Sequence, residues 1–509
     1  MRLFLTETDL INMRITAGAK LNTSKQIEYL INDDEGSSQK RLMSEGERYY
    51  VGEHDILNKD FRQTYISETD YEENRENIIK FRNPNRSNHH NVNAFHKILV
   101  DQKVSYIVGR EPTISVRGAE ENKDLKEYEK ILTDFADNDF NELIQDWVTG
   151  ASNKGFEAVH IYYDENGTLR HCISPANEII PIYDTEHEND LLQLIRYYNI
   201  TVVEDGRKYL RKKVEWWTKE DVTYYIETDK NKYILDNSYA YNPSPHWWSI
   251  TNLNGFEKTR VQHSFGRVPF IILKNNRKMT TDLQTIKGLI DAYDLISSEG
   301  TNDFLDLVSL YWAIQGYGGE TASAIAKKLQ INKAVNVSGG EGGRIEAKQV
   351  DIPVNGRKEF LNMLRRDIFH FGMGIDVDAE KFGNAPSGVS LKFQYTLIDL
   401  KVGNMTAKLK KAIKELLTYV TEDYNRKNNT SYDSSLIEIS INKTMITNDT
   451  ELVSMIQNSK GIVSDKTLLA KHPFVDDVNA ELAEIEAQRK KEQALWEGHQ
   501  EGDINVEEK

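Results

Sequence analysis

Two long stretches of helical periodicity, separated by a segment with strand-like and glycine-rich runs, constrain the fold of this chain most strongly. The first helix is predicted within residues 274–303, where four apolar residues recur at helical spacing: Leu283, Ile286, Ile290 and Tyr293. The second is predicted over residues 353–375, because Pro353 can begin a helix and apolar residues mark one side. The sequence therefore predicts a small α/β module, residues 304–352, inserted between two long helices.

The chain before residue 274 is predicted to be helical at first. Residues 1–45 are polar and helix-prone, and we expect a loosely held arm there. Residues 88–108 are apolar almost all round, which predicts a buried helix that ends at Gly109. Two more helices are expected near residues 122–137 and 139–154.

A β-rich part follows, over residues 156–273, where the apolar pattern changes to a period of about two. Asn166-Gly167 between two apolar runs predicts a hairpin turn. Further strand-like pieces recur near residues 191–200, 210–217, 222–227 and 261–273.

Beyond the second long helix, the sequence predicts a loop, a third helix, a short strand and a tail. The loop, residues 376–388, is rich in glycine, asparagine and proline, and the third helix runs from about Val389 to Asn425. A short strand is expected within residues 436–446, and the tail from residue 449 is acidic and helical. The whole chain is thus predicted to be α+β.

Composition and charge limit the partners of this chain. It has 509 residues, 39% of them hydrophobic, so two to four subdomains are expected. The net charge of −16, from 64 basic and 80 acidic side chains, disfavours DNA binding over the whole surface and favours solubility. No apolar run approaches the roughly eighteen residues of a membrane span, and no secretory leader is evident.

The sequence lacks the motifs of the common catalytic and cofactor sites. The glycine-rich run at residues 339–343 is followed by Arg344 instead of a Lys-Ser/Thr pair, which favours a hairpin turn over a phosphate loop. Neither His-Glu-x-x-His nor Gly-x-Ser-x-Gly occurs. The single cysteine, Cys172, excludes a disulfide framework and a four-thiolate metal site. We therefore expect no enzyme activity, no catalytic residue, no metal site and no cofactor.

One stretch of the sequence is strongly basic, although the chain as a whole is acidic. Between Ser390 and Lys414 there are six lysines and a single acidic residue, Asp399. A solvated helix face would explain this excess. Contact with phosphate, or with an acidic patch on a neighbouring subunit, would explain it equally.

Several short motifs occur in an informative order. They are NHHNVNAFHKILVDQKVSYIVGREP at residues 88–112, HSFGRVPF at 263–270 with Asn275-Asn276 after it, IDAYD at 290–294, IPV at 352–354, DIFHFG at 367–372 and PSGVSLKF at 386–393. Each is weak alone. Their order and spacing, from about residue 40 to 480, resemble those of the portal proteins of tailed double-stranded DNA bacteriophages, in the class found in long-tailed phages of Gram-positive hosts.

The resemblance implies a portal fold and a ring, usually of twelve subunits, at one capsid vertex. Such a subunit has an α/β wing, a two-helix stem, a small α/β clip, a long tunnel-lining helix and a helical crown. By position, the regions would be an N-terminal arm at 1–45, the wing at 46–273, stem helices at 274–303 and 353–375, the clip at 304–352, a tunnel loop at 376–388, the tunnel helix and its return into the wing at 389–435, and the crown and C-terminal tail at 436–509.

The resemblance also implies a conduit for double-stranded DNA during packaging and ejection. Implied DNA-channel residues are Lys381, Asn384, Ser387 and Lys392, and the implied partner surface of the clip comprises Lys327, Lys328, Lys333 and Arg344. Besides other copies of the chain, the implied partners are the terminase large subunit, a head–tail adaptor protein, the major capsid protein and a scaffolding protein, with no membrane. The implied location is the virion, at the portal vertex, and the host cytoplasm during assembly.

Two other functions stay open from the sequence. The chain could be another ring-forming head–tail connector or adaptor without the packaging role. Aromatic strands around Trp216-Trp217 and Trp247-Trp248 are compatible with a polysaccharide hydrolase, although such tryptophans are more simply core or subunit-interface anchors.

Overall fold

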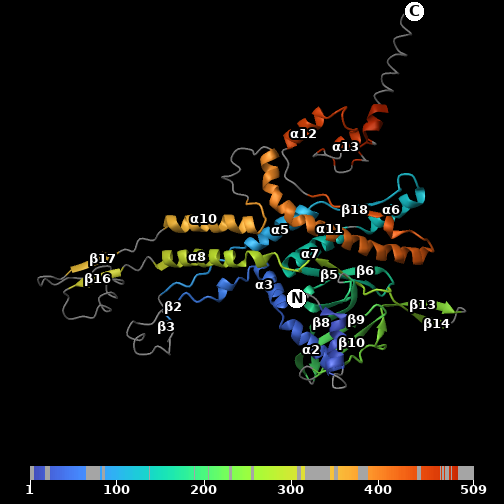
Figure 1. Ribbon diagram of the computed structural model, residues 1–509, viewed down its shortest axis with the longest axis horizontal. Helices are drawn as coiled ribbons and strands as arrows, with labels where there is room; N and C mark the ends of the chain where they lie inside the picture. The colour runs from blue at the N-terminus through green and yellow to red at the C-terminus, as the bar shows by residue number, and fades with distance from the viewer. Residues whose placement is uncertain are drawn as a thin grey trace, which may run out of the picture. The chain divides into compact units, whose positions relative to one another are not determined.

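The computed structural model divides into two compact units (Figure 1). The first unit comprises Met1–Asp376 and Leu397–Lys443, and the second comprises Val377–Thr396 and Thr444–Lys509. The structure describes residues 5–17, 23–64, 81–82, 86–136, 138–187, 190–204, 206–228, 232–253, 257–306, 311–315, 344–348, 354–376, 388–443, 449–469, 472, 475, 478, 481–482 and 484–490.

The first unit contains a seven-stranded sheet. Its order is β1-β7-β8-β9-β10-β11, with β12 paired to β10. The strands are β1 (Leu5–Thr6), β7 (Ile179–Tyr183), β8 (Leu191–Glu204), β9 (Arg207–Trp217), β10 (Asp221–Glu227), β11 (Tyr233–Leu235) and β12 (Ser244–Pro245). A core cluster packs on each face of this sheet, because the consecutive residues Trp216 and Trp217 of β9 point to opposite faces and belong to two different clusters. The sequence prediction that these tryptophans are core residues is confirmed.

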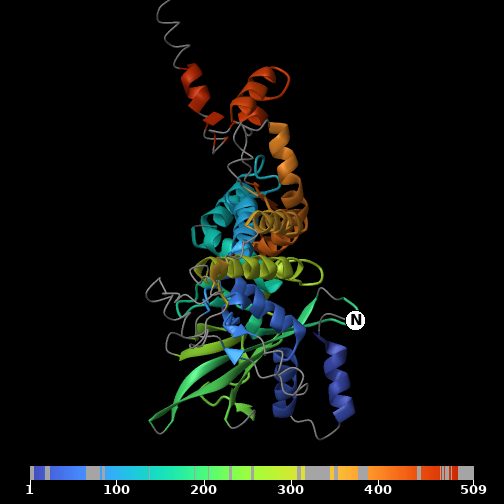
Figure 2. The same cartoon turned by 90° about the vertical axis from the view of Figure 1, so that its left-hand side faces the viewer.

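Three N-terminal helices pack beside this sheet: α1 (Glu7–Ala17), α2 (Thr23–Glu35) and α3 (Ser38–Tyr50). Figure 2 shows them in blue next to the green strands. Ile27, Leu30 and Ile31 of α2 are buried in one core cluster with Trp216. The loose packing expected for residues 1–45 is therefore wrong for α2, whose apolar side the sheet covers.

A smaller sheet of order β15-β5-β6 carries the predicted hairpin. Its strands are β5 (Phe156–Tyr163), β6 (Leu169–Ser174) and β15 (Phe270–Lys274). The Asn166-Gly167 turn is confirmed, with Gly167 at φ +74°, a conformation that glycine adopts readily. Two-stranded pairs are β13 (Trp247–Leu253) with β14 (Glu257–His263), β2 (Gln63–Thr64) with β3 (Phe81–Arg82), and β4 (Thr113–Val116) with β18 (Ile437–Ser440).

The helices α5 (Phe95–Val108), α6 (Lys123–Phe135) and α7 (Asn138–Lys154) match three predicted helices, with one correction. The first was predicted from residue 88, but the helix begins at Phe95. Residues 86–94, which we call the strap, are not helical because their polar groups bond to a distant helix, as described below. Short 3-10 helices lie at η2 (Asp55–Asn58), η3 (Ala176–Glu178), η4 (Leu283–Thr285) and η5 (Ser434–Leu436).

The two long helices predicted at 274–303 and 353–375 correspond to α8 (Lys287–Asp306) and α10 (Val354–Phe371), which lie side by side (Figures 1 and 2). The first begins later than predicted, because the side chains of Asn275 and Asn276 bond the backbone of Thr280 in a non-helical turn. In the chain between them, β16 (Tyr311–Gln315) pairs with β17 (Arg344–Lys348) in antiparallel fashion. The helical run and the glycine-rich turn expected within 304–352 lie outside the described residues.

The third predicted helix is α11 (Gly388–Asn428), which has 41 residues. The second unit contains α12 (Asp449–Asn458) and α13 (Asp465–Leu469). The mixture of helices and sheets agrees with the predicted α+β class. Within the described part of the chain, no helix is both long and apolar enough to span a membrane.

Candidate functional site

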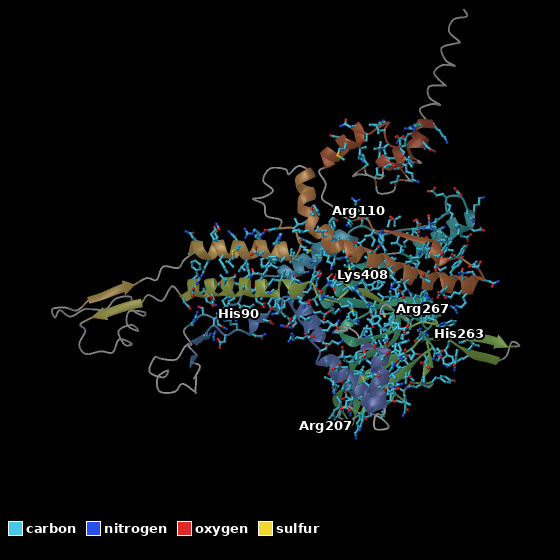
Figure 3. The ribbon with its side chains drawn as sticks, in the orientation of Figure 1. His90, Arg110, Arg207, His263, Arg267 and Lys408 are labelled. Carbon is cyan, nitrogen blue, oxygen red and sulfur yellow. The ribbon has the colours of Figure 1, made fainter. Side chains whose placement is uncertain are left out.

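A row of buried polar side chains runs along α8 and binds the strap. Asp294, Ser298 and Asn302 have no exposed surface, although all three are polar. Each accepts a hydrogen bond from a backbone N–H of the strap, as does Asp306: Asn93 to Asp294 (2.9 Å), Asn91 to Ser298 (2.9 Å), His89 to Asn302 (2.7 Å) and Ser87 to Asp306 (3.0 Å). Figure 3 labels His90 on the strap beside α8.

The match between strap and helix follows from their repeat distances. Four residues of an α-helix rise about 6 Å, and two residues of an extended chain advance about 6.6 Å. Every second strap residue can therefore meet every fourth residue of α8. The polar side chains replace the hydrogen bonds that the extended backbone would otherwise lose on burial.

The beginning of α8 is tied to the segment that follows α3. The Nδ1 atom of His54 lies 2.5 Å from the carboxylate of Asp294, and its ring stacks on Tyr49 with 4.3 Å between centroids. Lys287 bridges Asp55 and Asp291 at 2.6 and 2.8 Å. Although burial raises the pKa of Asp55, hydrogen bonds from Lys287 and Arg48 outweigh it and hold that pKa at about 2.

The pair α8 and α10 joins oppositely charged helices. Helix α8 contains five acidic residues and one lysine, whereas α10 contains four basic and two acidic residues. Arg357 of α10 forms an ion pair with Asp303 of α8. Nearer the start of α8 and the end of α10, the two helices meet in an apolar cluster that includes Ile290 and Ile368.

One side of α10 is apolar and is left exposed by the described part of the chain. Phe360, Met363 and Phe371 are 44%, 39% and 57% exposed, and their spacing of three and eight residues places them on one side of the helix. We call these three residues the α10 stripe. Large apolar residues gathered on one exposed face mark a protein interface more often than an isolated one does.

The residues that the resemblance implied for the clip are placed only in part. Arg344 begins β17, where it pairs in register with Gln315 of β16. Lys327, Lys328 and Lys333 lie outside the described residues.

The implied DNA-channel residues are likewise placed only in part. Lys381, Asn384 and Ser387 lie outside the described residues. Lys392 belongs to the second turn of α11, and its side chain is not described.

The lysine-rich part of α11 does not form a single free cationic face. Lys401 donates to the backbone carbonyl of Gly372 at 2.9 Å, and Lys414 donates to the carbonyls of Ser435 and Ile437 at 2.8 and 2.9 Å. Lys408, labelled in Figure 3, is half-buried, and burial lowers the pKa of its ammonium. Two of the six lysines are thus bonded to the protein's own backbone, whereas Lys411 is exposed.

The polar row on α8 was missed from the sequence. Its signal was present, because Asp294, Ser298, Asn302 and Asp306 recur every four residues in a helix whose other sides carry apolar residues. The sequence could not reveal the partner, which lies about 200 residues away in the chain.

The described residues contain no group of three or more His, Cys, Asp or Glu side chains arranged to hold a metal ion. The tryptophans of the alternative hydrolase function pack within the protein: Trp247 stacks on His263 at 3.9 Å, and Arg426 lies over its ring.

Comparison with known proteins gives one family and two relatives. Residues 31–495 match the family described as "Phage portal protein, SPP1 Gp6-like". The chain is 31% identical over 445 residues to the portal protein of Bacillus phage SPP1, covering 87% of this chain and 82% of that protein. It is also 31% identical over 490 residues to the portal protein of Clostridium phage phiCD119, covering 92% of this chain and 97% of that protein.

Proposed function

This chain belongs to the family of SPP1 Gp6-like phage portal proteins, and from that membership we propose that it forms a twelve-subunit ring at one capsid vertex, through which double-stranded DNA is packaged and ejected. A portal protein is a structural component of the phage virion and not an enzyme. The observation that carries the proposal is the similarity over most of the chain, which includes the two helices α8 and α10 and the insert between them.

The α10 stripe supports assembly into a ring. Phe360, Met363 and Phe371 would be covered by a neighbouring copy, which removes apolar surface from water. The exposed cation Arg366 of α10 lies beside the stripe, where an acidic side chain of the neighbour would offer complementary charge.

The acidity of the chain supports a conduit in which DNA slides. Twelve copies at −16 would give the ring a charge of roughly −190, which repels the phosphate backbone and opposes tight binding. Lys381, Asn384, Ser387 and Lys392 are proposed to touch the DNA transiently, with 376–388 as the tunnel loop and α11 as the tunnel helix.

The remaining partners follow from the same proposal. The insert between α8 and α10, with Lys327, Lys328, Lys333 and Arg344, is proposed as the clip that binds the terminase large subunit and then the head–tail adaptor. The wing, residues 46–273, and the crown, residues 436–509, are proposed to meet the major capsid protein and the scaffolding protein. Assembly would take place in the host cytoplasm, before the ring becomes part of the virion.

The first test is the mass of the purified protein by native mass spectrometry, together with negative-stain images. A species near 0.7 MDa with a central hole is expected, since twelve chains of 58.7 kDa give roughly that mass. If the protein stays small even with scaffolding protein added, the ring is refuted.

A packaging assay separates a portal from a connector that forms a ring without a packaging role. We expect Lys381→Ala and Lys392→Ala to leave the ring mass unchanged and to impair DNA packaging, with Lys411→Ala on the exposed side of α11 as the control. Normal packaging by both variants would remove the proposed role of these lysines. A wild-type ring that never supports packaging would favour the connector.

The clip has its own test. Replacing residues 307–353 by a short flexible linker removes β16 and β17 but leaves α8 and α10 whole. The deleted protein should keep a folded wing and lose binding to the terminase and the adaptor. Retained binding of both partners would show that the insert is not the clip.

A further inference from the structure

One buried carboxylate, that of Asp282, is shared by two lysines from different helices. Lys103 of α5 lies 3.0 Å from it and Lys401 of α11 lies 3.3 Å from it. Asn275 completes the cluster: its side-chain N–H donates to Asp282 at 2.9 Å, and its side-chain oxygen accepts from Lys103 at 2.6 Å. Burial lowers the pKa of Lys103 to about 8, as expected where two ammonium groups share one carboxylate.

Lys401 also holds the C-terminal end of α10. Its ammonium donates to the carbonyl of Gly372, one of the last carbonyls of a helix, which have no partner within the helix itself. A positive charge at this end is further favoured by the helix dipole. One side chain thus links α11 both to the end of α10 and to the cluster at Asp282.

Helix α5 packs closely against the same end of α10. A Cβ atom at Gly372 or Gly374 would lie 2.6 or 2.1 Å from a methyl group of Leu99, so only glycine fits under this leucine. Three residues on, the side chain of Gln102 bonds both backbone groups of Ile375: it donates to the carbonyl at 2.7 Å and accepts from the N–H at 3.0 Å.

Helix α5 also holds the part of α11 that lies in the first unit. The hydroxyl of Tyr106 donates to Asp399 at 2.7 Å, and Ile398 and Val402 beside it are buried. Leu99, Gln102, Lys103 and Tyr106 are spaced by three, one and three residues, so they lie on one side of α5. We call these four residues the α5 stripe.

The α5 stripe therefore contacts the chain at both borders of the first unit. The chain leaves this unit after Asp376 and returns at Leu397. Gln102 holds Ile375, one residue before the departure, and Tyr106 holds Asp399, two residues after the return.

We propose that the α5 stripe and Lys401 are positioning residues, which fix the two ends of the segment 377–396 relative to each other. This inference rests on the proposed function, in which that segment faces the DNA. Because one rigid helix holds both ends, the path of the chain between them starts and finishes at a fixed spacing, whatever happens to the segment itself.

The charge of the cluster allows a variant that separates positioning from folding. Lys401→Met removes one of two ammonium groups and leaves Lys103 and Asp282 as a balanced pair, so the first unit should still fold. Gln102→Leu keeps the size of the side chain and removes both bonds to Ile375. The control is Lys411→Met, an equal change at an exposed position of the same helix.

The experiment measures hydrogen exchange of assembled rings and the rate of DNA packaging by the same preparations. In Gln102→Leu, peptides covering 372–376 should exchange at least tenfold faster, and in Lys401→Met so should peptides covering 397–405. Peptides covering 412–420 should not change in either variant, which a general loss of stability would not allow. Packaging should slow at least threefold in both variants and not in the control.

Three results would overturn the inference. Packaging at the wild-type rate, despite faster exchange at the two ends, would show that their spacing does not matter, while the proposed function would stand. Equal acceleration of exchange throughout the first unit would show a merely structural role. Failure of wild-type rings to package DNA would refute the proposed function, and the positioning role with it.

Discussion

The carboxylate of Asp294 and the imidazole of His54 meet at 2.5 Å with almost no exposure to solvent, although 240 residues separate them in the chain. The second oxygen of Asp294 accepts two hydrogen bonds from Asn93, both of 2.9 Å. A single side chain of α8 therefore joins the helix to the segment after α3 and to the strap. Such a group stabilises the fold only while all its partners are present.

Replacing Asp294 with alanine should lower the free energy of unfolding by about 3 kcal/mol or more, because it leaves buried groups of His54 and Asn93 without a partner. The measurement is urea denaturation of the unassembled protein. Glu299→Ala is the control, since Glu299 lies on the same helix and forms no hydrogen bond within the described residues. A loss below 1 kcal/mol for Asp294→Ala would contradict this account of the polar row.

Two glycines should respond oppositely to substitution by alanine. A Cβ atom at Gly46 of α3 would lie 2.0 Å from the carbonyl oxygen of Asn153 in α7, so Gly46→Ala should destabilise the protein by about 1–3 kcal/mol. At Gly288 of α8 nothing lies within 4 Å, so Gly288→Ala should stabilise it by about 0.5–1 kcal/mol. The melting temperatures of the two variants test the close approach of α3 and α7. If both substitutions shift the melting temperature in the same direction, this account of the two glycines is wrong.

His160 should make the wild-type protein sensitive to acid. Burial lowers its pKa to about 3, its ring stacks on Phe270 at 4.4 Å, and its buried Nε2 has no hydrogen-bond partner in the described part of the chain. The imidazole is therefore neutral in the folded state, whereas the unfolded state binds a proton below about pH 6.5. The free energy of unfolding is therefore highest above that pH, and it decreases as the pH falls towards 3.

His160→Phe should remove this decline. Between pH 7.5 and pH 5 the wild type should lose about 2 kcal/mol more than the variant, as measured by denaturation at both pH values. Parallel losses in the two proteins would mean that His160 is protonated in the folded state.

The α10 stripe should be needed for assembly and not for folding. Phe360→Asp places a charge on a side chain that is 44% exposed in the single subunit but buried in the proposed ring. We expect a folded subunit with a melting temperature close to wild type and no ring by native mass spectrometry. Asn362→Asp adds the same charge at an exposed position outside the stripe and should assemble. Normal rings from Phe360→Asp would place the subunit interface elsewhere.

Local patterns predicted the elements of this protein well where each element carries its own signal. The Asn166-Gly167 turn, the helices α6 and α7, and the pair α8 and α10 follow from spacing and turn chemistry alone. The start of α5 could not be predicted in this way. Residues Asn91 and Asn93 form hydrogen bonds to α8 and therefore do not continue α5 towards the N-terminus. Tertiary contacts of this kind outweigh local propensity.

The candidate site was harder to predict than the elements. The cluster of lysines on α11 predicts a cationic surface, but in the structure Lys401 and Lys414 donate hydrogen bonds to backbone carbonyls. Which lysines face inward depends on where α10 ends and where β18 lies, and neither is encoded in the periodicity of α11. The partner of each lysine is set by the packing of segments that are distant in the chain.

The pairing of β18 with β4 has a consequence for biosynthesis. Arg117, next to β4, bonds Glu438 of β18, which the ribosome adds 321 residues later. At roughly 5–20 residues per second, the N-terminal strand waits about 15–65 seconds for its partner. During that time the nascent chain presents an unpaired strand edge. We expect the first unit to complete its folding only after residue 443 has left the ribosome, and truncated chains to depend on chaperones.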